Sequence, residues 1–144
     1  MSQVSSSQPM STSSVSPTYR RAATATLWTM QIVCALIFLG VGSMKLIAPA
    51  EVLLAQMPLK LPILFIRFIA VCEVAGALGL VLPGLTRIRR ELTPLAAGAL
   101  AMEMVGATVY TLLGGGGASA VLPLMVGLLC VAIAYGRRSF FAAI

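Results

Sequence analysis

Residues 61–82 read LPILFIRFIAVCEVAGALGLVL, and this stretch decides the fold of the chain. Its 22 residues include only two charged side chains, Arg67 and Glu73. A helix of about 20 apolar residues, rising about 1.5 Å per residue, crosses the roughly 30 Å hydrocarbon core of a bilayer. The stretch therefore predicts a transmembrane helix that carries two charges inside the membrane.

Three further apolar runs of similar length occur at residues 27–46, 93–113 and 118–136. They are separated by prolines and by four consecutive glycines, which are typical of turns. Helices are the expected form, because lipid offers no partner to open backbone groups. The first run has span length and holds Lys45 near its far end, which favours a retained helix over a cleaved signal segment. We predict an all-α membrane protein, an antiparallel bundle of four transmembrane helices over residues 25–138.

The N-terminal segment has a different composition from the rest of the chain. Residues 1–18 are rich in Ser, Thr, Gln and Pro and show no apolar period. Such a segment cannot bury enough apolar surface to offset the entropy lost on ordering. We predict a disordered cytoplasmic tail over residues 1–24.

The composition excludes several kinds of site. The 144 residues are 59% hydrophobic and only 10% charged, whereas soluble domains have about 25% charged residues. The chain has no His, Asp or Asn, so all four acidic residues are Glu. A Ser-His-Asp triad, an imidazole-ligated zinc site and an Asp-rich calcium loop cannot be built from these residues alone. We expect no cofactor and no metal held by the chain itself, and no enzyme activity of the chain on its own.

The net charge of +6 is interpreted as a signal of membrane orientation. The basic residues stand in short clusters between the apolar runs, so we expect no nucleic acid as a partner. Only Lys45 and Lys60 fall on one side of the predicted membrane, and seven Arg fall on the other. Loops rich in Lys and Arg stay in the cytoplasm, which predicts that both termini are cytoplasmic. The seven are Arg20, Arg21, Arg87, Arg89, Arg90, Arg137 and Arg138.

Four charged residues lie within the predicted spans, namely Lys45, Arg67, Glu73 and Glu103. Arg67 lies roughly 9 Å and Glu73 roughly 18 Å below the outer end of its span, and Glu103 lies roughly 15 Å above the cytoplasmic end of the next one. The two carboxyls are thus at matched depth, where they cannot both stay ionised without a cation between them. Lys45 and Arg67 are the nearby cations. We predict a polar cluster of these four residues that opens outward.

Several features allow both a functional and a structural interpretation. Charged residues inside a membrane indicate function by default, but buried ion pairs also serve only to pack helices together. Cys34, Cys72 and Cys130 lie on different spans with no CxxC motif, and we expect them to be small buried packing residues. Residues 49–61 form either a short amphipathic stretch along the outer interface or a lipid-facing connector.

An ordered set of short motifs resembles the DoxX-like family of membrane proteins. The block RFIAVCEVAGALGLVLP, residues 67–83, is similar to the signature helix of that family, in which Arg is followed by Glu, Gly and a Leu-Leu-Pro ending. The likeness covers roughly residues 27–138. Its other parts are FLG at 38–40 with Lys45 before Pro49, MVGA at 104–107, and Arg137-Arg138.

The resemblance implies a four-helix bundle in the bacterial plasma membrane. The namesake of the family is associated with quinone-linked oxidoreductase complexes, and relatives with membrane redox or detoxification assemblies. Lys45, Arg67 and Glu73 match the family pattern, whereas Glu103 does not. Many relatives also have a His around Tyr110, which this chain lacks, so a proton-relay or metal role is not carried over.

We therefore expect an accessory membrane subunit of a quinone-linked redox complex that contacts quinone or another lipid-soluble substrate at Lys45, Arg67 and Glu73. Its expected partners are the lipid bilayer, subunits of the redox complex and further copies of the chain. One rival hypothesis is a small proton-coupled transporter that uses Glu73 or Glu103. Four-helix multidrug exporters need a Glu in the first span, however, and this chain has none there. The other rival is a structural assembly factor in which the cluster only fixes the register of the helices.

Overall fold

The structure is a computed structural model and describes residues 17–89 and 91–142. These residues form five α-helices and one short 3₁₀ helix, and no strand occurs among them. In chain order the elements are α1 (Pro17–Ile47), α2 (Ala50–Ala55), α3 (Ile63–Thr86), α4 (Leu92–Leu113), η1 (Gly117–Ala120) and α5 (Val121–Ala142).

The predicted all-α fold with four membrane-spanning helices is confirmed. Four helical segments of the described chain, α1, α3, α4 and the η1–α5 unit, are long and apolar enough to cross a bilayer. Three of them contain a predicted span whole, whereas α3 begins at Ile63, two residues after the start of the span predicted over residues 61–82. The chain is therefore a multi-pass membrane protein.

The predicted tail over residues 1–24 is wrong for its last part, because α1 already begins at Pro17. Proline suits the first turn of a helix, where its fixed φ is helical and its missing N–H needs no partner. Thr24 and Thr26 then continue the helix, since each hydroxyl donates to the carbonyl four residues earlier. Residues 1–16 lie outside the described part of the chain.

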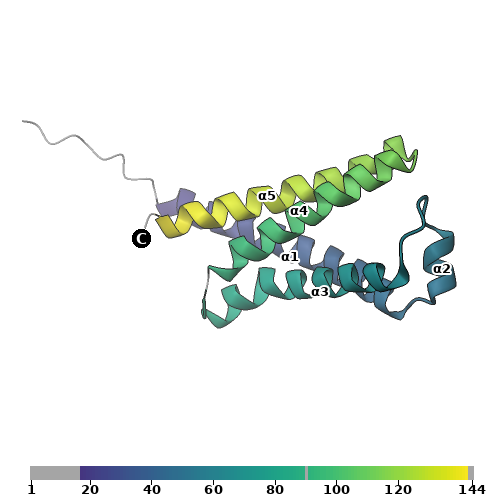
Figure 1. The fold of residues 1–144 in the computed structure, drawn as a ribbon. Helices are drawn as coiled ribbons and strands as arrows, with labels where there is room; N and C mark the ends of the chain where they lie inside the picture. The colour runs from purple at the N-terminus through teal and green to yellow at the C-terminus, as the bar shows by residue number, and fades with distance from the viewer. Residues whose placement is uncertain (1–16, 90, 143–144) are drawn as a thin grey trace, which may run out of the picture.

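The four long helices pack as two pairs. Helix α1 packs most extensively on α3, and α4 packs on α5, while the contacts of α3 with α4 and of α1 with α5 join the pairs. Figure 1 shows that the start of α1 and the end of α5 lie at one end of the bundle, with α2 and the α4–α5 connection at the other. This arrangement is the antiparallel one expected from an even number of spans.

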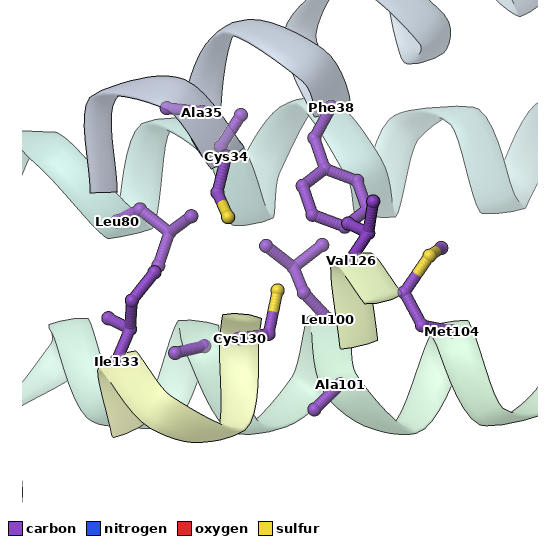
Figure 2. Packing of buried hydrophobic residues seen from close by; sticks show 12 residues of the cluster. Cys34, Ala35, Phe38, Leu80, Leu100, Ala101, Met104, Val126, Cys130 and Ile133 are labelled. Carbon is purple, nitrogen blue, oxygen red and sulfur yellow. The ribbon is translucent and has the colours of Figure 1, made fainter. Parts of the chain in front are cut away.

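The interior is small and mostly apolar, with a few buried polar side chains, and the outside is also apolar. Figure 2 shows the packed centre of the bundle, where Phe38 of α1, Leu80 of α3 and Leu100 of α4 meet residues of α5. Large side chains such as Leu64 and Met102 are 80% and 79% exposed on the outer surface. Lipid covers such side chains at no cost, which is why the polar groups are found inside the bundle.

The predicted stretch over residues 49–61 contains the short helix α2. Its Leu53 is buried, whereas Val52 and Leu54 are exposed. One apolar face of this segment therefore packs on the bundle and another remains open. Its position along the outer interface of the membrane stays a prediction.

Candidate functional site

The centre of the candidate site is an ion pair between α1 and α3. The Lys45 Nζ atom lies 2.6 Å from the Glu73 Oε1 atom, and the Glu73 side chain is 2% exposed. The Lys45 side chain is 26% exposed, so its stem runs along the bundle while its ammonium group reaches inward. Two of the four predicted cluster residues are thus in direct contact.

Gly42 permits this contact by letting α1 and α3 approach each other closely. A Cβ atom at position 42 would lie 3.0 Å from the carbonyl oxygen of Ala70 and 3.1 Å from the Cβ atom of Glu73. The first of these neighbours is backbone, which cannot rotate away. Because Lys45 follows three residues later on the same helix face, the close approach at Gly42 places its ammonium group beside Glu73.

Arg67 contacts α1 rather than a carboxyl group. Its guanidinium group donates to the carbonyl oxygens of Lys45 at 2.6 Å and Ala48 at 2.8 Å, and also to that of Leu46. Lys45 and Leu46 belong to the last turn of α1, and Ala48 directly follows its end. The last carbonyls of a helix have no intrahelical donor. Arg67 therefore forms hydrogen bonds across helices to the end of α1, and its acceptors there are backbone carbonyls rather than the carboxyls of the predicted cluster.

Glu103 projects from α4 toward the same point. Its carboxyl interacts with the Glu73 carboxyl, and both groups line one cavity. Within the described chain, the Oε1 atom of Glu103 and the Oε2 atom of Glu73 are buried polar atoms with no hydrogen-bond partner. The structure thus brings together Lys45, Glu73 and Glu103, with Arg67 one step away on α1.

The cavity around these groups has a volume of about 480 Å³. Most of its lining is apolar, and it lies between α3, α4 and the connection that follows α2. Tyr110 also lines it, and its hydroxyl donates to the carbonyl of Leu59 and accepts the Leu59 N–H at 3.2 Å. The connection is therefore tied to α4 above the cavity. The lining residues are Lys45, Met57, Leu61, Phe65, Ile66, Ile69, Glu73, Glu103, Met104, Gly106, Ala107 and Tyr110.

A second cavity, of about 570 Å³, follows the groove between α3 and α4. It shares Glu103, Phe65 and Ile69 with the first. Cys72 lines it and is exposed, so the expectation that all three cysteines are buried is wrong for this residue. Glu103 stands where the two cavities meet, which connects the charged cluster to the outer, lipid-facing surface of the bundle.

The other two cysteines agree with the expectation of buried packing residues. Cys34 and Cys130 are free thiols with no exposed surface. Figure 2 shows their sulfur atoms pointing toward one another from α1 and α5. Among the residues that the structure describes, no three His, Cys, Asp or Glu side chains gather around one point that could hold a metal ion.

A second polar group, near the opposite end of the bundle, was missed by the sequence analysis. Gln31 is fully buried and donates to the carbonyl of Leu80 at 2.7 Å, while its Oε1 atom accepts from the Arg137 Nε atom at 2.8 Å. The Arg137 guanidinium also lies 5.2 Å from the centre of the Trp28 ring. A lone Gln within an apolar run was the available signal. Arg137, predicted only as an orientation charge, thus also joins α5 to α1.

Comparison with known proteins identifies the family of the chain. The model of the DoxX-like family matches residues 29–133, which include all of α3 and α4, the larger parts of α1 and α5, and every member of the charged cluster. No curated protein and no solved structure matches the chain.

Proposed function

Because the chain belongs to the DoxX-like family, we propose that it is an accessory subunit of a quinone-linked redox complex and binds a lipid-soluble quinone in the cavity beside Lys45 and Glu73. In this proposal the protein lies in the bacterial plasma membrane with both termini in the cytoplasm. The chain supplies the binding site, and the redox centre belongs to a partner subunit.

The observation that carries the proposal is a charged pair at the wall of an otherwise apolar cavity. Sites for small organic molecules typically have volumes of about 300–1,000 Å³ and an apolar lining with a few convergent polar groups. The cavity of about 480 Å³ has this character, with Lys45, Glu73, Glu103 and Tyr110 as its polar groups. An isoprenoid quinone combines an apolar body with ring oxygens, which fits such a mixture.

Each part of the cavity has a role in this proposal. Apolar side chains such as Phe65 and Met104 enclose the ring and the first part of its tail. The groove between α3 and α4, which meets the cavity at Glu103, provides a path for the ligand from the lipid. Lys45 and Glu73 offer a hydrogen-bond donor and an acceptor to the ring oxygens of the oxidised or reduced form.

One observation also favours the structural rival. The ion pair of Lys45 with Glu73 and the hydrogen bonds of Arg67 all join α1 to α3. A cluster that only fixes the register of these helices would make the same contacts. Under this alternative, replacement of Glu73 lowers the stability of the protein and leaves any quinone affinity of the folded fraction unchanged.

The test is binding of a short-chain benzoquinone to the purified protein in lipid nanodiscs. We expect saturable binding, and Glu73→Gln should weaken it about ten-fold, because the loss of a charged hydrogen-bond partner costs on the order of 1.5 kcal/mol. Glu91→Gln, at the start of α4 and outside the cavity, is the matched control. Equal affinity of the wild type and the folded Glu73→Gln protein would contradict the proposal.

The role as an accessory subunit has a separate test. Purification of the native protein in mild detergent should yield a stable complex that contains a redox subunit with its own cofactor. Quinol-linked electron transfer in the membranes should fall when Glu73 is replaced at an unchanged protein level. A chain that purifies alone and whose replacement leaves electron transfer unchanged would show that it serves no such complex.

A further inference from the structure

The carboxyl groups of Glu73 and Glu103 lie together inside the bundle, which is unfavourable if both are ionised. Their side chains interact, yet the buried Oε2 atom of Glu73 and the buried Oε1 atom of Glu103 have no hydrogen-bond donor within the described chain. An ionised carboxyl group has only acceptor atoms. Two such groups can form a hydrogen bond with each other only when one of them carries a proton.

The charges around Glu73 and Glu103 indicate that the two carboxyl groups together bind one proton. Lys45 from α1 supplies a single positive charge at 2.6 Å from Glu73, and Arg67 directs its donors to the carbonyls at the end of α1. Cys130 of α5 also interacts with Glu103, and a thiol supplies no positive charge. One ammonium group against two carboxylates would leave a buried excess negative charge, which apolar surroundings disfavour strongly.

We propose that Glu73 and Glu103 form a proton-binding pair, in which Glu103 carries the proton and donates it to the Glu73 carboxylate held by Lys45. The cluster of Lys45, Glu73 and Glu103 is then electrically neutral as a whole. The proton resides on Glu103 because the ion pair with Lys45 stabilises the ionised form of Glu73. This inference concerns a proton as the ligand and holds whether or not the cavity also binds a quinone.

The position of Glu103 makes this proton chemically accessible. Glu103 lines both the cavity at the ion pair and the groove between α3 and α4, whose lining is apolar. A hydrophobic reagent dissolved in the lipid can therefore reach the acid through this groove. Dicyclohexylcarbodiimide is such a reagent and reacts with protonated carboxyl groups. The O–H adds across one C=N bond to give an O-acylisourea, which rearranges to an N-acylurea, so the peptide gains the whole reagent and nothing leaves.

The experiment treats the full-length protein in native membranes with this carbodiimide at pH 7 and locates the adduct by peptide mass spectrometry. We expect the adduct on Glu103 and none on Glu51 or Glu91, which lie outside the long apolar helices and serve as internal controls. The proposal is contradicted if Glu103 is labelled no more than these controls and the infrared spectrum described below also shows no protonated acid.

Two variants test the pairing itself. In Glu73→Gln, Glu103 becomes the only carboxyl available to Lys45, so it should ionise and its labelling should fall at least roughly ten-fold. In Lys45→Met, the positive charge is gone and both carboxyls should hold protons, so Glu73 should become labelled as well. Unchanged labelling of Glu103 in Glu73→Gln would show that the two residues do not share a proton.

Infrared spectroscopy of the purified protein detects a protonated carboxyl group directly, so its result does not depend on whether the carbodiimide reaches Glu103. The protonated acid should give a carbonyl stretch that shifts in D₂O, disappears in Glu103→Gln and remains in the matched control Glu91→Gln. Each spectrum is recorded on a sample whose helix content by circular dichroism equals that of the wild type. If neither the infrared band nor the adduct on Glu103 is found, the proposal is overturned.

Discussion

Lys45→Met removes the cation that holds Glu73 inside the bundle, and the structure allows its cost to be worked out. Removal of one partner of a buried ion pair costs about 3–5 kcal/mol, because the other charge is left without compensation. Two features place the present case at the lower end. Lys45 is itself 26% exposed, and Glu73 can take up a proton once its partner is lost. We expect a loss of about 3 kcal/mol in the free energy of unfolding, roughly a 150-fold change in the equilibrium constant.

The assay is reversible unfolding of the purified protein in bicelles by titration with dodecyl sulfate, followed by circular dichroism. A double-mutant cycle with Glu73→Gln isolates the interaction from the effects of each side chain alone. The double variant leaves no unpaired charge, so its stability should exceed the sum of the two single effects by at least about 1 kcal/mol. Effects that add to within about 0.5 kcal/mol would refute the reasoning, since they would show that the 2.6 Å contact has no energetic weight.

Three further substitutions test the contacts around this pair, all by the same unfolding assay. Arg67→Gln should cost about 3 kcal/mol, because it removes charged donors from several carbonyls at the end of α1, and Arg67→Lys should recover only part of this. Gly42→Ala should lower the free energy of unfolding by about 1–3 kcal/mol, because the new methyl group overpacks the contact of α1 with α3. Gly40→Ala has open space at its Cβ position and should not destabilise the protein. Equal effects at the two positions would contradict the close approach of the two helices at Gly42. Gln31→Leu should lower the free energy of unfolding by about 1–2 kcal/mol. It should also change the fluorescence of the single tryptophan, because Arg137, which stacks on the Trp28 ring, loses one of its acceptors. Unchanged fluorescence would show that the Gln31 amide does not position Arg137.

The four spans and the membrane fold could be predicted from the sequence because the physical cause is local. A run of about 20 apolar residues needs no knowledge of its neighbours to be a membrane helix. The same holds for the matched depth of Glu73 and Glu103, which follows from the rise per residue along two antiparallel helices. Depth alone also indicated that Lys45 was a candidate partner.

The contacts that depend on rotation and approach of helices could not be predicted. The distance between α1 and α3 depends on the missing side chain of Gly42, and this distance selects Lys45 rather than Arg67 as the partner of Glu73. Arg67 has two kinds of acceptor within reach, carboxylates and helix-end carbonyls, and its spacing from Glu73 along α3 does not choose between them. The start of α1 at Pro17 was missed because Thr and Pro favour loops in water, although both occur in the first turns of this helix.

The central claim, that the cavity beside Lys45 and Glu73 binds a quinone, is tested most directly by photolabelling. A benzoquinone with an azido group on its ring is added to membranes that contain the protein, activated by light, and mapped on the peptides. The account predicts adducts on cavity residues such as Phe65 and Met104, which excess unlabelled quinone suppresses and Glu73→Gln reduces. Adducts spread over lipid-facing residues such as Leu64 and Met102, with no effect of excess quinone, would contradict it.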